Sequence, residues 1–526
     1  MSDQMIPIPF RELLESALRE YKEKETVFGV KVNQNGSDLP IGPAAGPHTQ
    51  LAQNLAAAFV AGANCMELKT VQILEGEALG IPKPCIYAGH DVYNVEWSTE
   101  LTVEQALAEY VKAYLLIWAL WKLLKISRTT MPKFVMSVGY TLEGIKSSKI
   151  DAFIEGMKDA SSLKEWKQDL ELLAKQPDIP LKEIALLEKN SCIADTITLS
   201  TMHGCPAEDI QKIAVYLMKE KHLHTYIKLN PTLIGEQKVQ RILAAKGYQD
   251  LAYEEENFTH DCTLAMAAEL VRSCQKAAAE EKRIFGVKMT NTFPVKIKHQ
   301  ELEGSQMYLS GPALYALALN AASELAQMTE DLPISYSGGI DDKNVKTVLE
   351  TGIQPVTVSS YLLKPGGYHN LSRLFRVADG CRIPRSVERE SLQQEAENAI
   401  WNTNYNQKPD VTFPIIDGYD TTCAKCHNCV DVCPNRANIR ISVNGQDVVI
   451  HRNRLCNACG CCSCWCIMGH DPYLEKITLY EKEEEYRNEN SDREAILYEN
   501  GSFRYRKDGQ EQPLADEMKK MIKRIR

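Results

Sequence analysis

The sequence predicts an α/β protein in which a barrel of about eight parallel strands is followed by a small cysteine-rich domain. From residue 39 to residue 385, short β-branched runs alternate with long stretches of helical periodicity. This alternation is typical of parallel strands joined by helices, and the number of units fits a closed (β/α)8 TIM barrel. An open doubly wound sheet is the alternative. Between Cys423 and Cys466, one spacing of cysteines occurs twice, which indicates the second domain.

The chain divides into several predicted segments. Its 526 residues exceed the length of roughly 250 to 300 residues at which a single core stops growing, so more than one domain is expected. The segments are an N-terminal helical segment (1–38), the barrel (39–385), a polar linker or wrapping segment (386–416), the cysteine-rich domain (417–475) and a C-terminal hairpin with a basic helix (476–526).

Individual elements are predicted from hydrophobic periodicity and β-branched runs. A first helix is expected over Phe10–Lys24 and a buried helix over Ala113–Leu124. Strand-like runs lie at Cys65–Val71, Phe134–Val138, Thr196–Leu199, Tyr226–Leu229, Phe285–Met289, Ile334–Tyr336 and Pro355–Val358. Helical stretches that follow such runs lie at Ala207–Lys221, Cys262–Lys282, Pro312–Met328 and Asp342–Glu350.

The C-terminal segment is expected to contain short strands, a hairpin and a helix. Ile477–Tyr480 and Ala495–Tyr505 have the composition of strands, and Asn500-Gly501 is a favoured hairpin turn. The basic stretch Met518–Arg526 predicts a short helix with a solvated face, and docking to a partner is the alternative.

Composition and charge argue against several classes of protein. The net charge of −10 leaves no basic footprint for nucleic acid. The N-terminal residues lack the cationic and apolar regions of a signal peptide, and the most apolar run is too short to cross a membrane. Ten of the 17 cysteines lie between residues 423 and 466, which indicates metal binding in a reducing cytoplasm and not a disulfide framework.

The cysteine-rich domain contains two copies of the spacing Cys-x2-Cys-x2-Cys-x3-Cys. In bacterial ferredoxins the first three thiolates of such a run hold one cubane cluster, and the fourth ligates the other cluster. A zinc site, the alternative, needs only four ligands, usually as separated CxxC pairs. The sequence therefore predicts two [4Fe-4S] clusters, and exposed clusters of this kind suggest an anaerobic host. Crossed ligation assigns Cys423, Cys426, Cys429 and Cys466 to one cluster, and Cys433, Cys456, Cys459 and Cys462 to the other, with Cys461 and Cys464 outside the pattern.

Several barrel segments resemble the flavin barrel of dihydropyrimidine dehydrogenase and dihydroorotate dehydrogenase. Pro40–Thr49, Glu67–Thr70 and Thr198–Gly204 resemble its first and middle strands. Further matching segments follow in the same order, at Ile227–Thr232, Thr290–Thr292, Leu309–Gly311, Ser337–Ile340 and Val358–Ser360. A barrel followed by a two-cluster ferredoxin is also similar to the C-terminal half of dihydropyrimidine dehydrogenase. Through its PAAGPHTQLAQN, ELKTVQIL, TLSTMHGCP and KPGGY segments, the chain resembles still more a bacterial YgfK-like family that is also known as a selenate reductase subunit.

This resemblance implies a bound FMN. In barrels the loops after the seventh and eighth strands bind phosphate through backbone N–H groups. Ser337-Gly338-Gly339 follows one such strand, where glycine lets the backbone approach an anion, and Ser359-Ser360 follows the next. A tight loop without a ligand is the alternative. The predicted flavin contacts other than lysines are Ala44, Ala45, Gly311, Gly338, Gly339, Ser359 and Ser360.

Two lysines, Lys69 and Lys228, stand at the ends of apolar strand runs. A cation there is costly unless it is paired. The resemblance places Lys228 near N1 of the flavin, where it would stabilise the anionic reduced ring, and Lys69 beside the ring system. The alternative is a buried lysine paired with a carboxylate such as Glu67 or Glu143.

The predicted substrate contacts are Asn291 and Thr292, with Glu143 near a position where the resembling enzymes have a substrate-binding Asn. In those enzymes an adjacent Asn and Thr bind a pyrimidine ring. An Asn side chain both donates and accepts hydrogen bonds, as a lactam edge requires. For Asn291 and Thr292, a helix N-cap or a turn is the alternative.

Reduction of a ring also needs a proton donor, and the sequence offers three candidates. In the resembling enzymes a Cys or Ser in the loop after the fourth strand has this role, and Thr201 occupies that position here. Cys205 precedes Pro206 at the predicted start of a helix, whose positive end would lower the thiol pKa toward neutrality. His203 would orient the donor or relay the proton. A buried cysteine and a core histidine are the alternatives.

The predicted function is that of an FMN- and iron–sulfur-dependent oxidoreductase that reduces a ring double bond of a pyrimidine, or of a purine such as urate. No G-x-G-x-x-G motif occurs in the sequence, so no nicotinamide or FAD domain is predicted. Electrons would therefore enter through the two clusters from a separate flavoprotein or ferredoxin. The alternatives are a non-catalytic electron-transfer subunit, including the selenate reductase role, and a barrel with a purely structural role.

Overall fold

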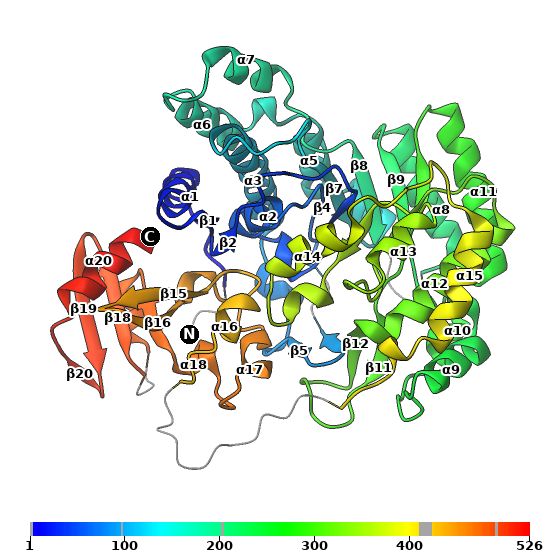
Figure 1. Cartoon of the computed structure of the whole chain (residues 1–526). Coiled ribbons are helices and arrows are strands. Elements are labelled where there is room, and N and C mark those ends of the chain that lie inside the picture. The colour runs from blue at the N-terminus through cyan, green and yellow to red at the C-terminus, as the bar shows by residue number, and fades with distance from the viewer. Residues whose placement is uncertain (1–3, 96–97, 201–204, 410–422, 490–492, 526) are drawn as a thin grey trace.

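The computed structural model describes residues 4–95, 98–200, 205–409, 423–489 and 493–525. Eight strands form a parallel sheet in the order β3-β14-β13-β10-β9-β8-β7-β4, which curves into a barrel (Figure 1). The strands are β3 (Ile41–Pro43), β4 (Cys65–Glu67), β7 (Lys133–Val138), β8 (Thr196–Ser200), β9 (His224–Leu229), β10 (Phe285–Met289), β13 (Ile334–Tyr336) and β14 (Val356–Val358). The predicted barrel is confirmed.

A glycine brings the first two strands of the barrel together and so completes the ring. The N–H of Asn64, just before β4, donates to the carbonyl oxygen of Ile41 in β3 at 2.9 Å. A Cβ atom on Gly42 would lie only 1.6 Å from the carbonyl oxygen of Cys65. No other residue type could occupy position 42 without moving β4, because the backbones themselves are in contact.

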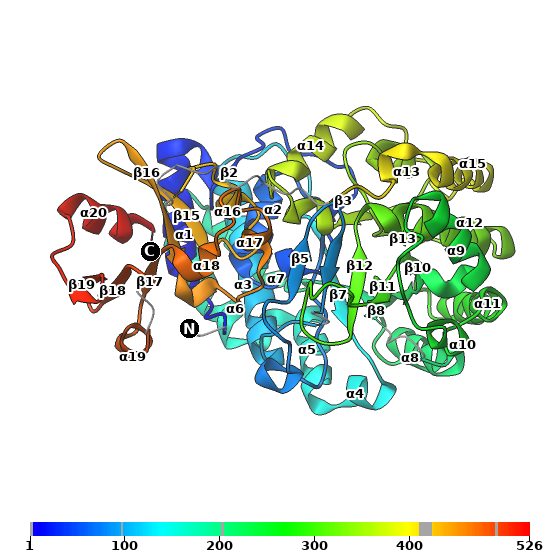
Figure 2. The ribbon, with the colours of Figure 1, turned by 90° about the horizontal axis from the view of Figure 1, so that it is seen from below.

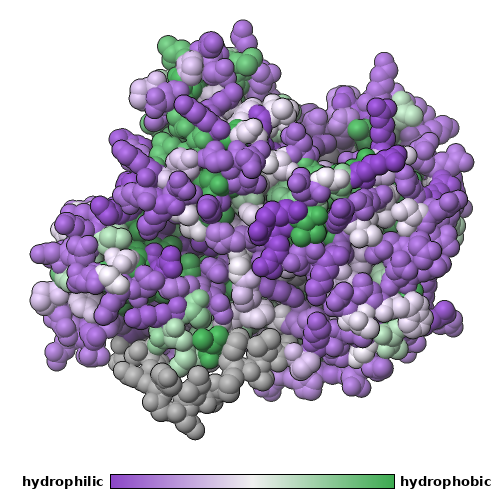
Figure 3. Space-filling model, in the orientation of Figure 1, coloured by the Kyte–Doolittle hydropathy of each residue, from purple (hydrophilic) through white to green (hydrophobic). Residues whose placement is uncertain are grey.

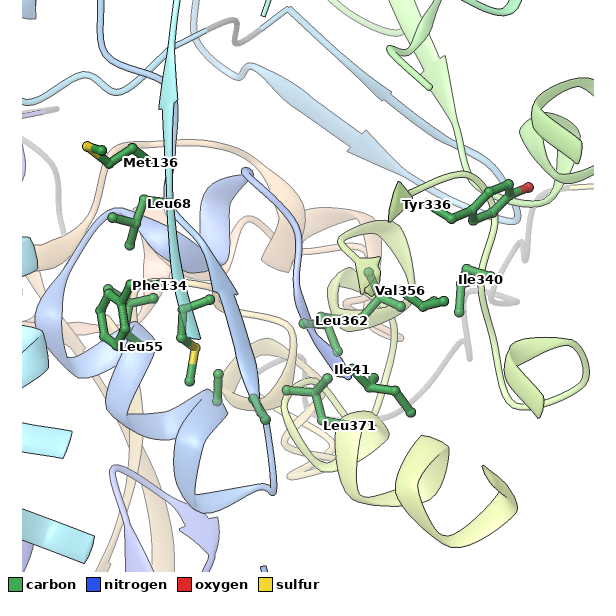
Figure 4. Close-up of a cluster of buried hydrophobic side chains, with 14 of the residues drawn as sticks. Ile41, Leu55, Leu68, Phe134, Met136, Tyr336, Ile340, Val356, Leu362 and Leu371 are labelled. Atoms are coloured by element: carbon green, nitrogen blue, oxygen red, sulfur yellow. The ribbon is translucent and has the colours of Figure 1, made fainter. Parts of the chain in front are cut away.

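Helices surround the barrel (Figures 1 and 2), and buried apolar residues of the helices and the strands form one core. Figure 4 shows Ile41, Tyr336 and Val356 of the strands together with Leu371 of α14 in this core. The first helix, α1 (Phe10–Lys24), has the predicted bounds. The others in this region are α2 (Ala52–Val60), α3 (Val103–Leu123), α4 (Leu142–Lys146), α5 (Ser148–Lys158), α6 (Lys164–Leu173), α7 (Leu181–Lys189), α8 (Ala207–Lys219), α9 (Glu236–Ala245), α10 (Glu256–Thr259), α11 (Leu264–Glu280), α12 (Pro312–Met328), α13 (Val345–Glu350) and α14 (His369–Ala378).

A small antiparallel sheet, here called the cap sheet, was not predicted from the sequence. Its order is β11-β12-β6-β5, with β5 (Ile86–Ala88), β6 (Val92–Asn94), β11 (Phe293–Lys296) and β12 (Gln306–Ser310). These strands lie in the segments that follow β4 and β10, so the cap sheet lies at the carboxyl ends of the barrel strands (Figure 2). Each strand is only three to five residues long, which is too short for a clear periodic signal.

The predicted linker wraps the barrel through a helix. Residues 389–401 form α15 (Arg389–Trp401), which packs against α12. The hydroxyl of Tyr315 donates to Glu395 at 2.7 Å, and the amide of Asn320 donates to the carbonyl oxygen of Ala396 at 2.9 Å. These contacts make residues 389–401 part of the barrel's outer layer, which agrees with the wrapping segment that the sequence offered beside a plain linker.

The cysteine-rich and C-terminal segments share one sheet, which crosses the predicted boundary at residue 475. Its order is β15-β16-β17-β18-β19-β20. Asn500 and Gly501 both have positive φ, as the predicted hairpin turn between β18 and β19 requires. The strands are β15 (Asn438–Val443), β16 (Gln446–Arg452), β17 (Ile477–Tyr480), β18 (Ala495–Glu499), β19 (Ser502–Lys507) and β20 (Gln510–Glu511), with α16 (Asn428–Asp431), α17 (Cys461–Cys464), α18 (Pro472–Glu475) and α19 (Glu483–Arg487) between or before them.

The last helix, α20 (Asp516–Ile525), is not merely a solvated face. Met518 and Ile522 are buried against the six-stranded sheet, while Lys520, Lys523 and Arg524 of α20 are exposed. The rest of the surface in Figure 3 is mainly hydrophilic. None of the helices in the described part of the chain combines the length and the apolar character needed to cross a membrane.

We expect Gly42→Ala to lower the thermal unfolding midpoint sharply. The added Cβ would meet the carbonyl oxygen of Cys65, and relieving that overlap by backbone movement should cost about 3 kcal/mol. Gly445→Ala is the matched control, because that turn glycine has open space around it and its left-handed backbone costs Ala only about 1 kcal/mol. Equal midpoints for the two variants would show that the contact between β3 and β4 does not limit stability.

Candidate functional site

A cavity of about 530 Å³ lies where the carboxyl ends of the barrel strands meet the cap sheet. Its volume is in the range of sites that bind small molecules and cofactors. Residues at the ends of the barrel strands line one side, as with Ser200, Lys228 and Val358. Ile86 and Tyr308 of the cap sheet line the other. This is the place at which barrels bind their ligands, because loops there converge from every strand.

The structure brings the predicted flavin residues together in this cavity. They come from segments more than 300 residues apart, yet all line the same space. Asn291 and Thr292, predicted as substrate contacts, line it as well, whereas Glu143 lies in α4 and outside the lining. The flavin residues that line the cavity are Ala44, Ala45, Lys69, Lys228, Gly311, Gly338, Gly339, Ser359 and Ser360.

Glycines let the loops predicted to bind phosphate approach one another closely. Gly339 has φ +65°, and a Cβ there would lie 2.6 Å from the carbonyl oxygen of Gly311. A Cβ on Gly46 would lie 2.7 Å from the hydroxyl oxygen of Ser359. The loops after β3, β12, β13 and β14 therefore meet at one edge of the cavity, where glycine leaves backbone and hydroxyl groups accessible to an anion.

A buried ion pair lies beneath the cavity floor. Lys288 Nζ is 2.9 Å from Glu67 Oε2, and each residue is about 2% exposed or less. Lys288 also donates to the hydroxyls of Ser335 and Thr357, at 3.3 and 2.8 Å. Glu67 accepts hydrogen bonds from the N–H of Ala45 and the hydroxyl of Thr357, both at 3.2 Å. The pair therefore joins β4, β10, β13 and β14 inside the barrel.

The same charged residues shift the pKa values of Glu67 and Lys228 at the cavity floor. Burial acts to raise the pKa of Glu67, but Lys288 and Lys228 outweigh it, and the pKa of Glu67 is lowered. Burial, with help from Lys288 and Lys69, lowers the pKa of Lys228 to about 8, against the opposing attraction of Glu67. The predicted alternative, a lysine paired with Glu67, is thus realised by Lys288, which sequence reasoning missed. A lysine in the middle of the apolar run Phe285–Met289 was the available signal.

The structure corrects the expectation for Cys205. Helix α8 begins at Ala207 with Pro206 as its N-cap, so Cys205 lies one residue before the cap. Burial, followed by the nearby Asp209 and Asp261, raises the pKa of its thiol and does not lower it. Cys205 lines a separate small cavity, and Lys228 lines both that cavity and the large one. The other two candidates, Thr201 and His203, lie outside the described residues.

Two further small cavities are each bordered by four cysteines. The grouping of these cysteines is the crossed one predicted from the spacing, in which each run lends its last cysteine to the other set. Within the described ranges, no three His, Cys, Asp or Glu side chains converge closely enough to hold a single metal ion. A cubane cluster is larger than one ion and holds its thiolates further apart, and four cysteines are the ligand set of one such cluster. The inner set is Cys433, Cys456, Cys459 and Cys462, and the outer set is Cys423, Cys426, Cys429 and Cys466.

The inner cysteine set adjoins the large cavity. The N–H groups of Cys85 and Ile86 donate to the carbonyl oxygen of Cys459, at 3.2 and 2.8 Å, and Ile86 lines the large cavity. The thiol of Cys461 donates to the carbonyl oxygen of Leu363, which also lines it. Figures 1 and 2 both show α17 beside β5. The cysteines outside the ligand pattern, Cys461 and Cys464, therefore contact the barrel, whereas Cys426 of the outer set is exposed.

Buried polar contacts fix the cysteine-rich segment to the barrel. The amide of Asn54 in α2 donates to Asn435 at 3.0 Å, and Asn435 donates to Asn457 at 3.2 Å. Asn457 in turn donates to Glu100 at 2.7 Å. A Cβ on Gly367 would lie 1.9 Å from the carbonyl oxygen of Asp431, so the backbones touch. These contacts, here called the docking seam, hold the inner cysteine set next to the cavity.

Known proteins similar to the chain show its family. The family described as oxidoreductase YgfK, N-terminal TIM-barrel domain, matches residues 15–408. The chain belongs to this family. Two Escherichia coli proteins named YgfK, from strain K12 and from O157:H7, are each 38% identical over 473 residues, covering 84% of this chain and 46% of their own length. The chain thus spans about half the length of these relatives.

Two solved structures of DHODH from Eimeria tenella are similar to the chain, but less so than the YgfK proteins. The complex with ferulenol is 14% identical, with a TM-score of 0.43 over 74% of this chain and 96% of that one. The ligand-free form is also 14% identical, with a TM-score of 0.40 over 75% and 99%. Likeness at this level supports no argument about function.

We expect Glu67→Gln to destabilise the protein by about 3–5 kcal/mol, because it leaves the buried ammonium of Lys288 without a charged partner. Glu67→Gln combined with Lys288→Met should recover most of this loss, since both charges are then removed. Free energies of unfolding from urea titration provide the measurement.

Glu15→Gln is the matched control for this prediction. Its pair with Arg11 is exposed on α1 and screened by solvent, so the change should leave the free energy of unfolding nearly unchanged. A Glu67→Gln variant as stable as Glu15→Gln would contradict the importance of the buried pair.

Proposed function

We propose that the protein is an FMN- and iron–sulfur-dependent oxidoreductase that reduces a ring double bond of a nucleobase-like heterocycle, a pyrimidine or a purine such as urate. The observation that supports this most is a single cavity lined by every predicted flavin contact and two predicted substrate contacts, with a four-cysteine set next to it. FMN, when bound, supplies hydride-transfer chemistry, and [4Fe-4S] clusters supply one-electron transfer. Each double bond reduced takes up two electrons and two protons.

In this proposal the residues of the chain bind the FMN and the substrate and orient them. The glycine and serine loops after β13 and β14 bind the phosphate, and Lys228 with Lys69 faces the ring system. The amide of Asn291 donates to Asn230 at 2.6 Å, which fixes its orientation toward the substrate side. The charges beneath the floor favour an anionic ligand, because Glu67 is outnumbered by the lysines around it.

The cysteine sets provide the electron route in this proposal. The outer set, with Cys426 exposed, receives electrons from a separate flavoprotein subunit or ferredoxin. The inner set passes them to the cavity across β5, to which Cys459 is hydrogen-bonded.

The proton donor proposed for the reaction is one of Thr201, His203 and Cys205. Because its pKa is raised, the thiol of Cys205 stays protonated at neutral pH and has a proton to donate. Lys228 lies between the small cavity of Cys205 and the large one, so a proton from Cys205 would reach the substrate by way of this lysine.

We expect the protein purified without oxygen to contain about eight iron atoms per chain. Cys423→Ser and Cys466→Ser should alter the same electron paramagnetic resonance signal, because crossed ligation places both on the outer cluster. Cys433→Ser and Cys456→Ser should each alter the other signal, because crossed ligation places both on the inner cluster. Cys461→Ser is the control and should retain both signals. If Cys466→Ser instead alters the same signal as Cys456→Ser, the ligation is not crossed.

We expect the purified protein to contain about one FMN per chain and, once reduced, to be re-oxidised by at least one pyrimidine or purine. Bleached flavin is mixed anaerobically with each heterocycle and with selenate, and its absorbance is followed. Re-oxidation by redox proteins alone would favour the electron-transfer subunit, and re-oxidation by selenate would favour the selenate reductase role. If the purified protein contains no flavin, the result would favour a barrel with only a structural role.

A further inference from the structure

One face of the cap sheet forms a wall of the cavity, and this face carries both polar and apolar side chains. In β12, Gln306, Tyr308 and Ser310 line the cavity, while Met307 and Leu309 between them are buried on the opposite face. Tyr308 pairs directly with Asn94 of β6, which also lines the cavity. Side chains paired in this way share a face of the sheet. These polar side chains of β6 and β12 therefore point toward the cavity, and Met307 and Leu309 point toward the packed interior.

A buried hydrogen-bond donor faces the same cavity from α10. Asn257 lines the cavity, and its Nδ2 group is buried without a hydrogen-bond partner within the described part of the chain. A buried amide left without a partner is costly, so such a group indicates a missing acceptor. A carbonyl oxygen on a ligand in the cavity would supply that acceptor.

Five side-chain amides stand among the polar residues that line the cavity. They come from the segment after β4, from the cap sheet and from the segments on either side of β10. Each amide offers both a donor and an acceptor, and together they match a ring whose edge alternates N–H and C=O groups. The amide residues in the lining are Gln72, Asn94, Asn257, Asn291 and Gln306.

The charged residues of the lining lie on the opposite side. Among the described residues that line the cavity, Lys69 and Lys228 are the charged ones, and both follow or end barrel strands next to Glu67. The described residues that line the cap-sheet side thus include no arginine for the two-pronged hydrogen bonding that a carboxylate favours. A carboxylate substituent of a ligand on that side would lose its hydration without gaining a cationic side chain as a partner.

We propose that Asn94, Gln306 and Tyr308 of the cap sheet, together with Asn257, determine substrate specificity by binding the edge of an N–H- and C=O-rich heterocycle without a carboxylate substituent. This inference rests on the proposed function, because it assigns the substrate side of the same cavity. These residues bind and select the ring. They take no part in electron or proton transfer.

The test measures binding by the oxidised, flavin-loaded protein, so it does not depend on turnover. Uracil, xanthine, urate and orotate are titrated separately, and the change in flavin absorbance gives each Kd. We expect at least one of the first three to bind and orotate to bind at least tenfold more weakly. Asn94→Leu and Gln306→Leu should each weaken the binding about tenfold, with flavin content unchanged. Asn257→Leu should do the same, because it removes the unpartnered donor.

Gln446→Leu is the matched control, because Gln446 is exposed on the β15–β16 hairpin far from the cavity, and it should leave every Kd unchanged. Unchanged binding in the cap-sheet variants, loss of flavin from them, or orotate binding as tight as that of the other rings would each overturn this inference alone. If no heterocycle perturbs the flavin and none re-oxidises it, the proposed function fails as well.

Discussion

The buried ion pair between Glu67 and Lys288 is the interaction on which the barrel and its cavity most depend. Its partners lie on β4 and β10, which are not neighbours in the sheet, so the pair crosses the barrel interior. A lone buried charge would cost several kcal/mol, so these strands must keep the register that brings the two groups together. Thr357 and Ala45 bond to the same carboxylate, which ties the cavity floor to the pair.

A second constraint places the cysteine-rich segment against the barrel. The docking seam is made of side-chain amides whose hydrogen bonds are directional, and of backbone contacts that leave no room for a side chain at Gly367. Electron transfer weakens steeply with distance. A seam of this kind, together with the contact of Cys459 on β5, keeps the inner cysteine set beside the cavity.

Local signals predicted much of the fold. The strand runs were found because buried parallel strands are continuous apolar stretches, and α1 and α12 were predicted to the residue because helical periodicity is strong over 15 residues or more. The cap sheet was missed because its strands are short, and α15 was missed because its polar sequence hides the few residues that pack on α12. The pKa of the Cys205 thiol is raised and not lowered, because burial and two nearby carboxylates disfavour the thiolate and because Pro206, not Cys205, is the N-cap of α8.

The sequence by itself determined the chemical inventory: eight cysteines at ferredoxin spacing, a glycine loop and a serine loop after the last two barrel strands, and two lysines at strand ends. These features are local, since spacing along the chain decides which atoms a short loop can present together. Only the tertiary structure decided that Lys288 pairs with Glu67, that the inner cysteine set adjoins the cavity, and that polar side chains of the cap sheet face the cavity. Each of these joins residues far apart in the sequence, so it depends on packing and on the burial of charge, which spacing along the chain does not determine.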